Sequence, residues 1–237
     1  MAPLPHARVP FAPRSWEDGV SLERMAWDEL PLFAELVRSA DGGAAEQPTR
    51  LRACWDLEAL YLRFDCEDRD AWGTLQRRDD PIYEEEVVEV FVEPGEREPA
   101  SYFELEVSPL GVLFDARIHN PTSRRAEMVI ETAWDCPGLR WQAGRGAARQ
   151  DWWAALAVPW AALAPATAEA GPPLVWRANF YRIERPRDRA TPELTAWSPT
   201  LNQPVDFHRP ARFGMLSLAP PDFHRAPDQA ARPRSTA

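Results

Sequence analysis

The chain has 237 residues, of which 45% are hydrophobic, and this is enough for the core of one large β domain or two small ones; we expect one. The net charge of −10 argues against a nucleic-acid partner, which would need a basic patch, and all 27 cationic residues are arginines, as in a chain with a compositional bias. No apolar run approaches the ~18 residues needed to insert into a membrane.

The N-terminus predicts the location of the protein. The first residues, MAPLPHARVPFAPRSWEDG, have prolines where a secretory signal needs an apolar segment. We therefore expect a cytoplasmic location, or an extracytoplasmic one if a leader has been removed.

The sequence of residues 1–48 predicts an irregular, proline-rich lead-in packed on the domain. Pro31 limits residues 22–38 to one short helix or an edge segment.

Period-2 alternation of apolar and polar residues predicts strands through the rest of the chain. A short helical turn is expected at 160–163, and a disordered, Ala/Pro-rich tail at 219–237. The expected strands are 49–55, 60–67, 86–92, 102–108, 112–118, 128–132, 139–143, 152–158, 174–183 and 213–218. This pattern indicates an all-β domain over 49–218, an antiparallel β-sandwich of immunoglobulin or jelly-roll type with short irregular helical turns.

The three cysteines are Cys54, Cys66 and Cys136, an odd number without a CxxC pair. A turn at 56–59 would place Cys54 opposite Tyr61 in a hairpin, several residue pairs away from Cys66. A disulfide between Cys54 and Cys66 would not close across that distance, so we expect reduced, structural thiols.

The stretch 70–94 joins an aromatic loop to a strand that carries carboxylates. Trp72 and Tyr83 lie in loop-like sequence, and Glu89 alternates with Val88 and Val90 inside an apolar strand. Aromatic rings stack on the C–H face of a sugar, and carboxylates accept charge-assisted hydrogen bonds from its hydroxyls. These residues are therefore candidates for a saccharide site.

Later strands add polar candidates. Glu104 and Glu106 share one face of a strand and would meet Glu89 across the sheet, or would form a solvent face balanced by Arg177 and Arg182. Further ligand-binding candidates are Asn179, Tyr181, Arg182 and Trp197, whereas Trp55, Trp152, Trp153, Trp160 and Trp176 are expected in the core.

These patterns require no cofactor, and one oxygen-rich loop is a candidate for structural calcium. Asp65, Asp68 and Asp70 form an oxygen-rich loop that could hold Ca²⁺, although the spacing is not that of an EF-hand. His119 and His208 are isolated, which is more typical of structural or exposed histidines than of ligands.

Several blocks in order resemble the family 9 carbohydrate-binding modules and their DOMON-like relatives. They are WDLEALYLRFDCED, EEEVVEVFVEP, DWWAALAVPWAAL, NFYRIER, AWSPT and FHRPARFGMLSL. The resemblance implies a β-sandwich that binds a glycan chain end, with a terminal sugar held between two aromatic rings, and in some members structural calcium. Carried over by position, it places the rings on Tyr83 and Phe207 and the hydroxyl-binding carboxylate on Glu89.

The resulting hypothesis is non-catalytic binding of a saccharide, in which a terminal sugar is held by aromatic stacking and by carboxylate and arginine hydrogen bonds. One alternative is a glycoside-active enzyme that uses two of Glu86, Glu89, Glu104 and Glu106 as acid and base. Another is a DOMON-like ligand or protein-interaction domain. A haem version of that domain would need axial ligands that the histidines and methionines do not obviously supply. The oligomeric state is not predicted.

Overall fold

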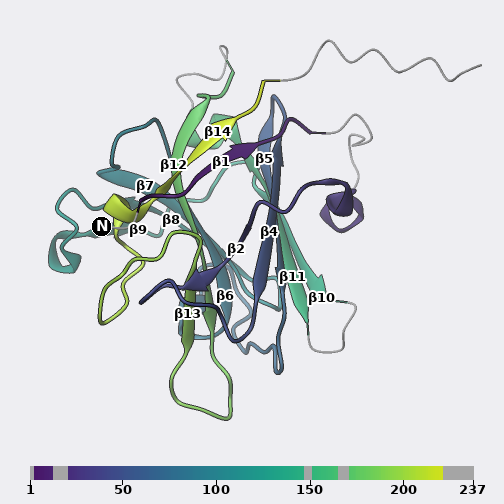
Figure 1. Cartoon of the computed structure of the whole chain (residues 1–237), viewed down its shortest axis with the longest axis vertical. Helices are drawn as coiled ribbons and strands as arrows, with labels where there is room; N and C mark the ends of the chain where they lie inside the picture. The colour runs from purple at the N-terminus through teal and green to yellow at the C-terminus, as the bar shows by residue number, and fades with distance from the viewer. Residues whose placement is uncertain (1–2, 13–20, 147–150, 165–170, 221–237) are drawn as a thin grey trace, which may run out of the picture.

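The computed structural model describes residues 3–12, 21–146, 151–164 and 171–220. Over these ranges the protein is the β-sandwich that the alternation predicts, with a nine-stranded and a five-stranded sheet facing each other (Figure 1). Helical structure in the same ranges is confined to α1 (Trp160–Leu163) and short 3₁₀ turns.

The larger sheet is organised around its long strand β12 (Val175–Glu184). β6 (Val87–Pro94) pairs with β12 along one side, while β14 (Gly214–Leu218) and β13 (Glu193–Ala196) share the other side. The remaining strands of this sheet are β7 (Ser101–Val107), β8 (Leu113–His119) and β9 (Val129–Glu131), which continue beyond β6, with β1 (His6–Val9) beside β14 and β3 (Val37–Arg38) beside β13. All described pairs are antiparallel except β1 with β14.

The smaller sheet has the order β10-β11-β5-β4-β2. These strands are β10 (Arg140–Arg145), β11 (Trp152–Pro159), β5 (Ala59–Cys66), β4 (Thr49–Trp55) and β2 (Ala34–Glu35). The β4–β5 hairpin pairs Cys54 with Tyr61 and Cys66 with Thr49. The three cysteines are free and buried, as predicted.

The main core lies between the two sheets. On β6 and β12 the even-numbered residues face this core, among them Val88, Val90 and Phe180, where they pack with Leu62 and Leu156 of the smaller sheet. The five tryptophans predicted as core are all buried: Trp55, Trp152, Trp153, Trp160 and Trp176.

A second apolar layer covers the outer face of the larger sheet. It contains Phe91, Tyr102, Tyr181 and Phe213, together with Phe207 from the loop before β14. Because this layer keeps water from much of the outer face, the odd-numbered polar residue Glu89 of β6 is buried as well. This arrangement positions the candidate site.

The N-terminal segment is less irregular than its sequence predicts. It contributes β1 and β3 to the larger sheet and β2 to the smaller one, so it is built into both layers. The segment 22–38 forms the 3₁₀ turns η1 (Leu22–Arg24) and η2 (Trp27–Glu29) followed by two short edge strands. The disorder predicted for 219–237 concerns residues that lie, apart from 219 and 220, outside the described ranges.

Membrane insertion through a helix finds no support in this structure. Within the described ranges no helix has the length and apolar character needed to cross a bilayer.

Candidate functional site

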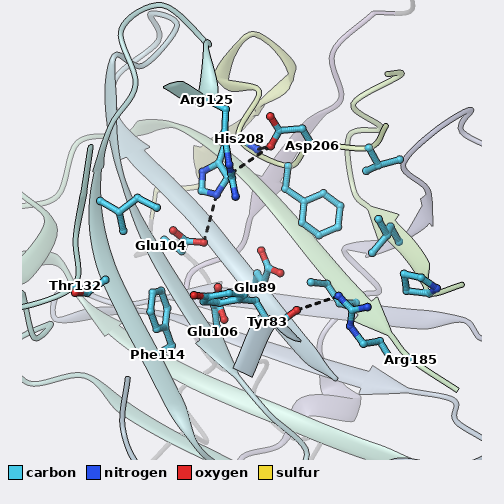
Figure 2. Close-up of a pocket in the computed structure, with 16 residues that line it drawn as sticks. Tyr83, Glu89, Glu104, Glu106, Phe114, Arg125, Thr132, Arg185, Asp206 and His208 are labelled. Carbon is cyan, nitrogen blue, oxygen red and sulfur yellow. Dashed lines mark hydrogen bonds and ion pairs between the residues drawn. The ribbon is translucent and has the colours of Figure 1, made fainter. Parts of the chain in front are cut away.

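A pocket of about 430 Å³ opens on the outer face of the larger sheet (Figure 2). Its floor comes from β6, β7, β8 and the end of β12, and its walls come from the 3₁₀ turns η3 (Ile82–Glu84) and η4 (Arg125–Glu127) and from loops around β13 and β14. Volumes of roughly 300 to 1,000 Å³ are usual for small-molecule sites. The pocket is lined by Tyr83, Glu89, Glu104, Glu106, Phe114, Arg125, Ile130, Thr132, Ile183, Arg185, Pro192, Leu194, Val205, Asp206, Phe207 and His208.

Three glutamates converge on the floor of this pocket. Glu89 of β6 lies directly opposite Glu106 of β7 in the strand register, and Glu104 is two residues along the same face. One carboxylate oxygen from each lies within 4.8 Å of the others. Pleating explains the cluster, because alternate residues of neighbouring strands point to the same side of a sheet.

The carboxyl groups of this trio are buried and incompletely paired. Burial raises the pKa of Glu89 and of Glu106 well above the ordinary value, and the neighbouring carboxyls raise them further. Burial likewise raises the pKa of Glu104. Among the described residues, Oε2 of Glu104 and Oε2 of Glu106 have no hydrogen-bond partner. Carboxyl groups with unpaired acceptor oxygens can accept hydrogen bonds from the donors of a ligand.

His208 borders the trio as a neutral imidazole. Burial and the nearby Arg125 lower the pKa of His208 to about 3. Its Nδ1 lies 2.7 Å from the hydroxyl oxygen of Tyr102. Figure 2 shows its other contact, in which Nε2 lies 3.9 Å from Oε1 of Glu104. His208 therefore adds no positive charge to the pocket floor near neutral pH.

Aromatic rings contribute to the walls of the pocket. Tyr83 is 41% exposed and meets Phe114 edge-on, with ring centroids 5.5 Å apart. Phe207 is buried and stacks on Tyr181 at 4.2 Å with an interplanar angle of 14°. Tyr83 is thus the ring with most surface available for a ligand, while Phe207 is held rigidly from behind.

Charged residues lie at the edge of the pocket. Nη1 of Arg125 is 3.5 Å from Oδ1 of Asp206, and Nη2 of Arg185 donates to the backbone oxygen of Tyr83 at 3.4 Å (Figure 2). In the part of the chain that the structure describes, no ion pair joins either arginine to the three glutamates. No arginine of the described ranges therefore compensates the three carboxyl groups of the floor by direct contact.

Five of the ten sequence-predicted ligand residues line this pocket: Tyr83, Glu89, Glu104, Glu106 and Phe207. Two of the other five lie just beneath it. Tyr181 is fully buried and donates its hydroxyl to the backbone oxygen of Phe207, and Asn179 bonds the Tyr181 hydroxyl and the backbone of Ser198. These two residues support the site instead of lining it.

Trp72 and Trp197 do not line the pocket. Nε1 of Trp72 donates to the backbone oxygen of Arg185 at 2.7 Å, which fixes the loop next to the pocket. Trp197 packs on Phe33 and Phe180 at the inter-sheet core. Neither ring is therefore a wall of this pocket.

Arg182 faces the opposite side of the sheet from the pocket. It is 1% exposed, and its Nη2 bonds Oδ2 of Asp68 at 2.7 Å as well as Oε2 of Glu184. Nη1 donates to the backbone oxygen of Glu67 at 2.8 Å and to Oγ1 of Thr49. Arg182, a ligand-binding candidate from the sequence, therefore does not line this pocket, and its side chain ties β12 to the smaller sheet.

The structure does not bring the predicted calcium ligands together. Asp65 is bonded by Arg52 and Arg63, and Asp70 by Arg187. Asp68 instead joins Glu86 and Glu184 in a buried group whose oxygens lie within 4.8 Å. The guanidinium of Arg182 bonds two members of this group, so it already supplies a positive charge there. The residues present therefore do not fit the predicted calcium set.

The sequence interpretation missed several pocket residues. Phe114 and Ile183 were placed in strands without a role, although their alternation puts them on the outer face. His208 directly follows Phe207 but was interpreted as isolated. Arg125 and Asp206 lie in loops whose sequence carries no periodic signal.

The sequence profile described as carbohydrate-binding family 9 matches residues 47–218, well over half of the chain. The chain belongs to carbohydrate-binding family 9. All pocket residues fall inside the matched segment. Strands β1, β2 and β3 lie outside it, so the family 9 segment is completed here by the chain that precedes it.

One curated protein is similar to about half of this chain. A protein from Arthroderma benhamiae described as an extracellular protein is 27% identical over 125 residues, which are 52% of this chain and 49% of that protein. The chain thus spans about half of the length of this curated relative.

Three solved structures show the same fold. A protein from Bacteroides uniformis described as a candidate carbohydrate-binding protein has a TM-score of 0.71 and 16% identity, covering 92% of this chain and 100% of that one. A family 9 module from Caldicellulosiruptor kristjanssonii in complex with glucose has a TM-score of 0.59 and 11% identity, covering 94% and 100%. The same organism's module in complex with cellotriose has a TM-score of 0.56 and 12% identity, covering 95% and 100%. At these identities the likeness establishes the fold.

Proposed function

We propose that this family 9 chain binds a saccharide in the pocket without transforming it. A terminal sugar ring would lie against Tyr83 and Phe207 while the glutamates of the floor bind its hydroxyls. The observation that carries the proposal is the meeting of aromatic walls with a floor of buried carboxyl groups. Family membership supports it, as do the Caldicellulosiruptor modules in complex with glucose and with cellotriose.

The arrangement of the carboxyl groups favours binding over catalysis. Acid and base residues of glycoside hydrolases flank the scissile bond, with carboxyls about 5 to 9.5 Å apart. Here Glu89, Glu104 and Glu106 all rise from two neighbouring strands and share one side of the pocket. A sugar above them would meet carboxyl groups on one face only. Turnover of aryl glycosides that is lost in Glu89→Gln would contradict this argument.

The affinity expected from these groups is modest. Each charge-assisted hydrogen bond contributes about 1.5 to 3 kcal/mol net, and ring stacking about 1 kcal/mol. After the cost of association these contributions suggest a Kd of roughly micromolar to millimolar.

Calorimetric titration of the full chain with glucose, cellobiose and cellotriose tests the proposal. Binding should be lost or weakened by about tenfold in Tyr83→Ala, because the ring contact is removed. The Tm should change little, since Tyr83 is 41% exposed. Leu57→Ala is a matched control, because Leu57 is 69% exposed and lies outside the pocket. Absence of binding to every saccharide, or unchanged affinity in Tyr83→Ala, would contradict the assignment.

A further inference from the structure

The floor of the pocket offers three carboxyl groups, which provide more acceptor oxygens than the hydroxyls of a neutral sugar need. Glu89, Glu104 and Glu106 are all buried, and their carboxylate oxygens lie within 4.8 Å of one another. Oε2 of Glu104 and Oε2 of Glu106 have no hydrogen-bond partner among the described residues. Buried acceptors without a donor cost free energy, so they indicate a missing partner.

That partner needs several donors and a positive charge. Both arginines of the pocket, Arg125 and Arg185, are engaged elsewhere, by Asp206 and by the backbone of Tyr83. His208 is neutral. An ammonium group has three N–H donors and a charge that three carboxyl groups can share.

The size and walls of the pocket indicate that the cation is carried by a ring. A volume of about 430 Å³ is far larger than a bare ion needs, and Tyr83, Phe114 and Phe207 provide aromatic surface around it. Aromatic faces also attract cations. The combined site therefore fits a sugar ring that bears a charged amine.

From these observations we infer that the pocket selects an amino sugar, with its ammonium group placed among Glu89, Glu104 and Glu106. The inference rests on the proposed saccharide binding and specifies the class of sugar. Glu106 and Glu104 act as specificity-determining residues, because each contributes an oxygen without a partner. N-acetylation of the amine would remove both the charge and two of its three donors.

Binding of an ammonium ion is coupled to protons. In the free protein the raised pKa values keep protons on the trio, and the ammonium displaces them by favouring the ionised carboxylates. The affinity should therefore increase as the pH rises through the pKa values of the trio and fall again where the amine loses its own proton. The charged or titratable groups that face the trio are Arg125 from η4, Tyr83 from η3, Tyr102 from β7, Tyr181 of β12 and Arg185 directly after it, and Asp206 and His208 from the loop before β14.

Calorimetry at neutral pH with glucosamine, glucose, N-acetylglucosamine and cellotriose tests the inference. Glucosamine should bind about tenfold tighter than glucose or more, as one charge-assisted hydrogen bond provides. Two buffers of different ionisation enthalpy should report proton release with glucosamine and not with glucose.

Glu106→Gln and Glu104→Gln keep the shape of the side chain and should remove the preference for glucosamine over glucose. Glu86→Gln is the matched control, because Glu86 is buried outside the pocket.

The outcomes separate this inference from the proposed function. Equal or tighter binding of glucose or cellotriose would overturn the amino-sugar inference and leave saccharide binding intact. No binding of any sugar would overturn both. A Tm raised by CaCl₂ in the wild type but not in Glu106→Gln, without a response to glucosamine, would identify the trio as a metal site and overturn the inference.

Discussion

The three carboxyl groups of the pocket floor make the free energy of unfolding depend on pH. Burial disfavours the ionised form and raises the pKa of each carboxyl in the folded protein, whereas the unfolded chain releases the proton near the ordinary value of 4.5. The folded state therefore binds more protons than the unfolded state above that pH. By linkage, the free energy of unfolding falls as the pH rises from about 4.5 through the folded-state pKa values.

Glu106→Gln should consequently stabilise the protein at pH 8 and have little effect at pH 4. Each unit of pKa shift corresponds to about 1.4 kcal/mol of unfolding free energy, so a gain above about 1 kcal/mol is expected at the higher pH. Urea denaturation at a series of pH values measures it. Glu84→Gln, at an exposed position, is the control, and an identical pH slope in Glu106→Gln and wild type would refute the explanation.

His208 changes the pH dependence of stability in the opposite direction, at acidic pH. Its pKa is about 3 in the folded protein against the ordinary value of 6.5, so the unfolded state binds the extra proton between these values. Stability supplied by His208 is therefore present above about pH 6.5 and is lost as the pH falls towards 3. In His208→Gln the loss of unfolding free energy between pH 6.5 and pH 4 should be smaller than in the wild type, as chemical denaturation would reveal.

The buried guanidinium of Arg182 stabilises the contact between the two sheets. It compensates the buried carboxyls of Asp68 and Glu184. Arg182→Met should destabilise the protein by about 3 to 5 kcal/mol, because it leaves buried charge without a partner. Adding Glu184→Gln should recover part of this loss, as a double-mutant cycle of denaturation midpoints would show. Full additivity of the two changes would argue against direct compensation.

At the scale of elements, the positions of the longer strands can be predicted from the sequence. Which face of a strand points to the pocket cannot. The 49–55 strand has the predicted bounds, and most others differ by one or two residues, because alternation is a local property. Strands β2 and β3 have two residues each, too few for any period. They form because neighbouring strands offer them partners.

The same limit explains the errors at the site. Both faces of β12 are buried, so its sequence does not show that Tyr181 faces the pocket side and Arg182 the inter-sheet side. The meeting of Glu89, Glu104 and Glu106 on one face, one of two alternatives that the sequence left open, follows from strand register. The loop residues Arg125 and Asp206 depend on chain paths that register does not determine.

The contact between β14 and the Trp197 loop is an element-scale constraint. A Cβ at Gly214 would lie 2.5 Å from the ring of Trp197 and 2.8 Å from the backbone oxygen of Pro5. Gly214→Ala should therefore lower the free energy of unfolding by about 1 to 3 kcal/mol, as in other overpacked sites. Gly73→Ala is the matched control, because its Cβ would meet only the side chains of Leu110 and Glu85 at 3.3 Å or more. Equal Tm values for the two variants would contradict this contact.

At the scale of the whole molecule, the family match is shorter than the folding unit. The match begins at residue 47, yet β1 and β3 complete the larger sheet and β2 the smaller one. A protein that starts at residue 47 should thus have a lower Tm than the full chain, or fail to fold. Val9→Asp tests the same point in the full chain, since Val9 is fully buried in the inter-sheet core. Unchanged thermal unfolding in both variants would show that the lead-in is dispensable.

The parallel pairing of β1 with β14 has a consequence for synthesis on the ribosome. β14 lies between β1 and β12, so the first strand to be translated finds its place only after the last one has emerged. Until then β12 presents part of an unpaired edge, which is a hazard for association with other nascent chains. Folding of this module should therefore wait until β14 has left the ribosome, and should be slow for its size because its closing contact spans nearly the whole described chain.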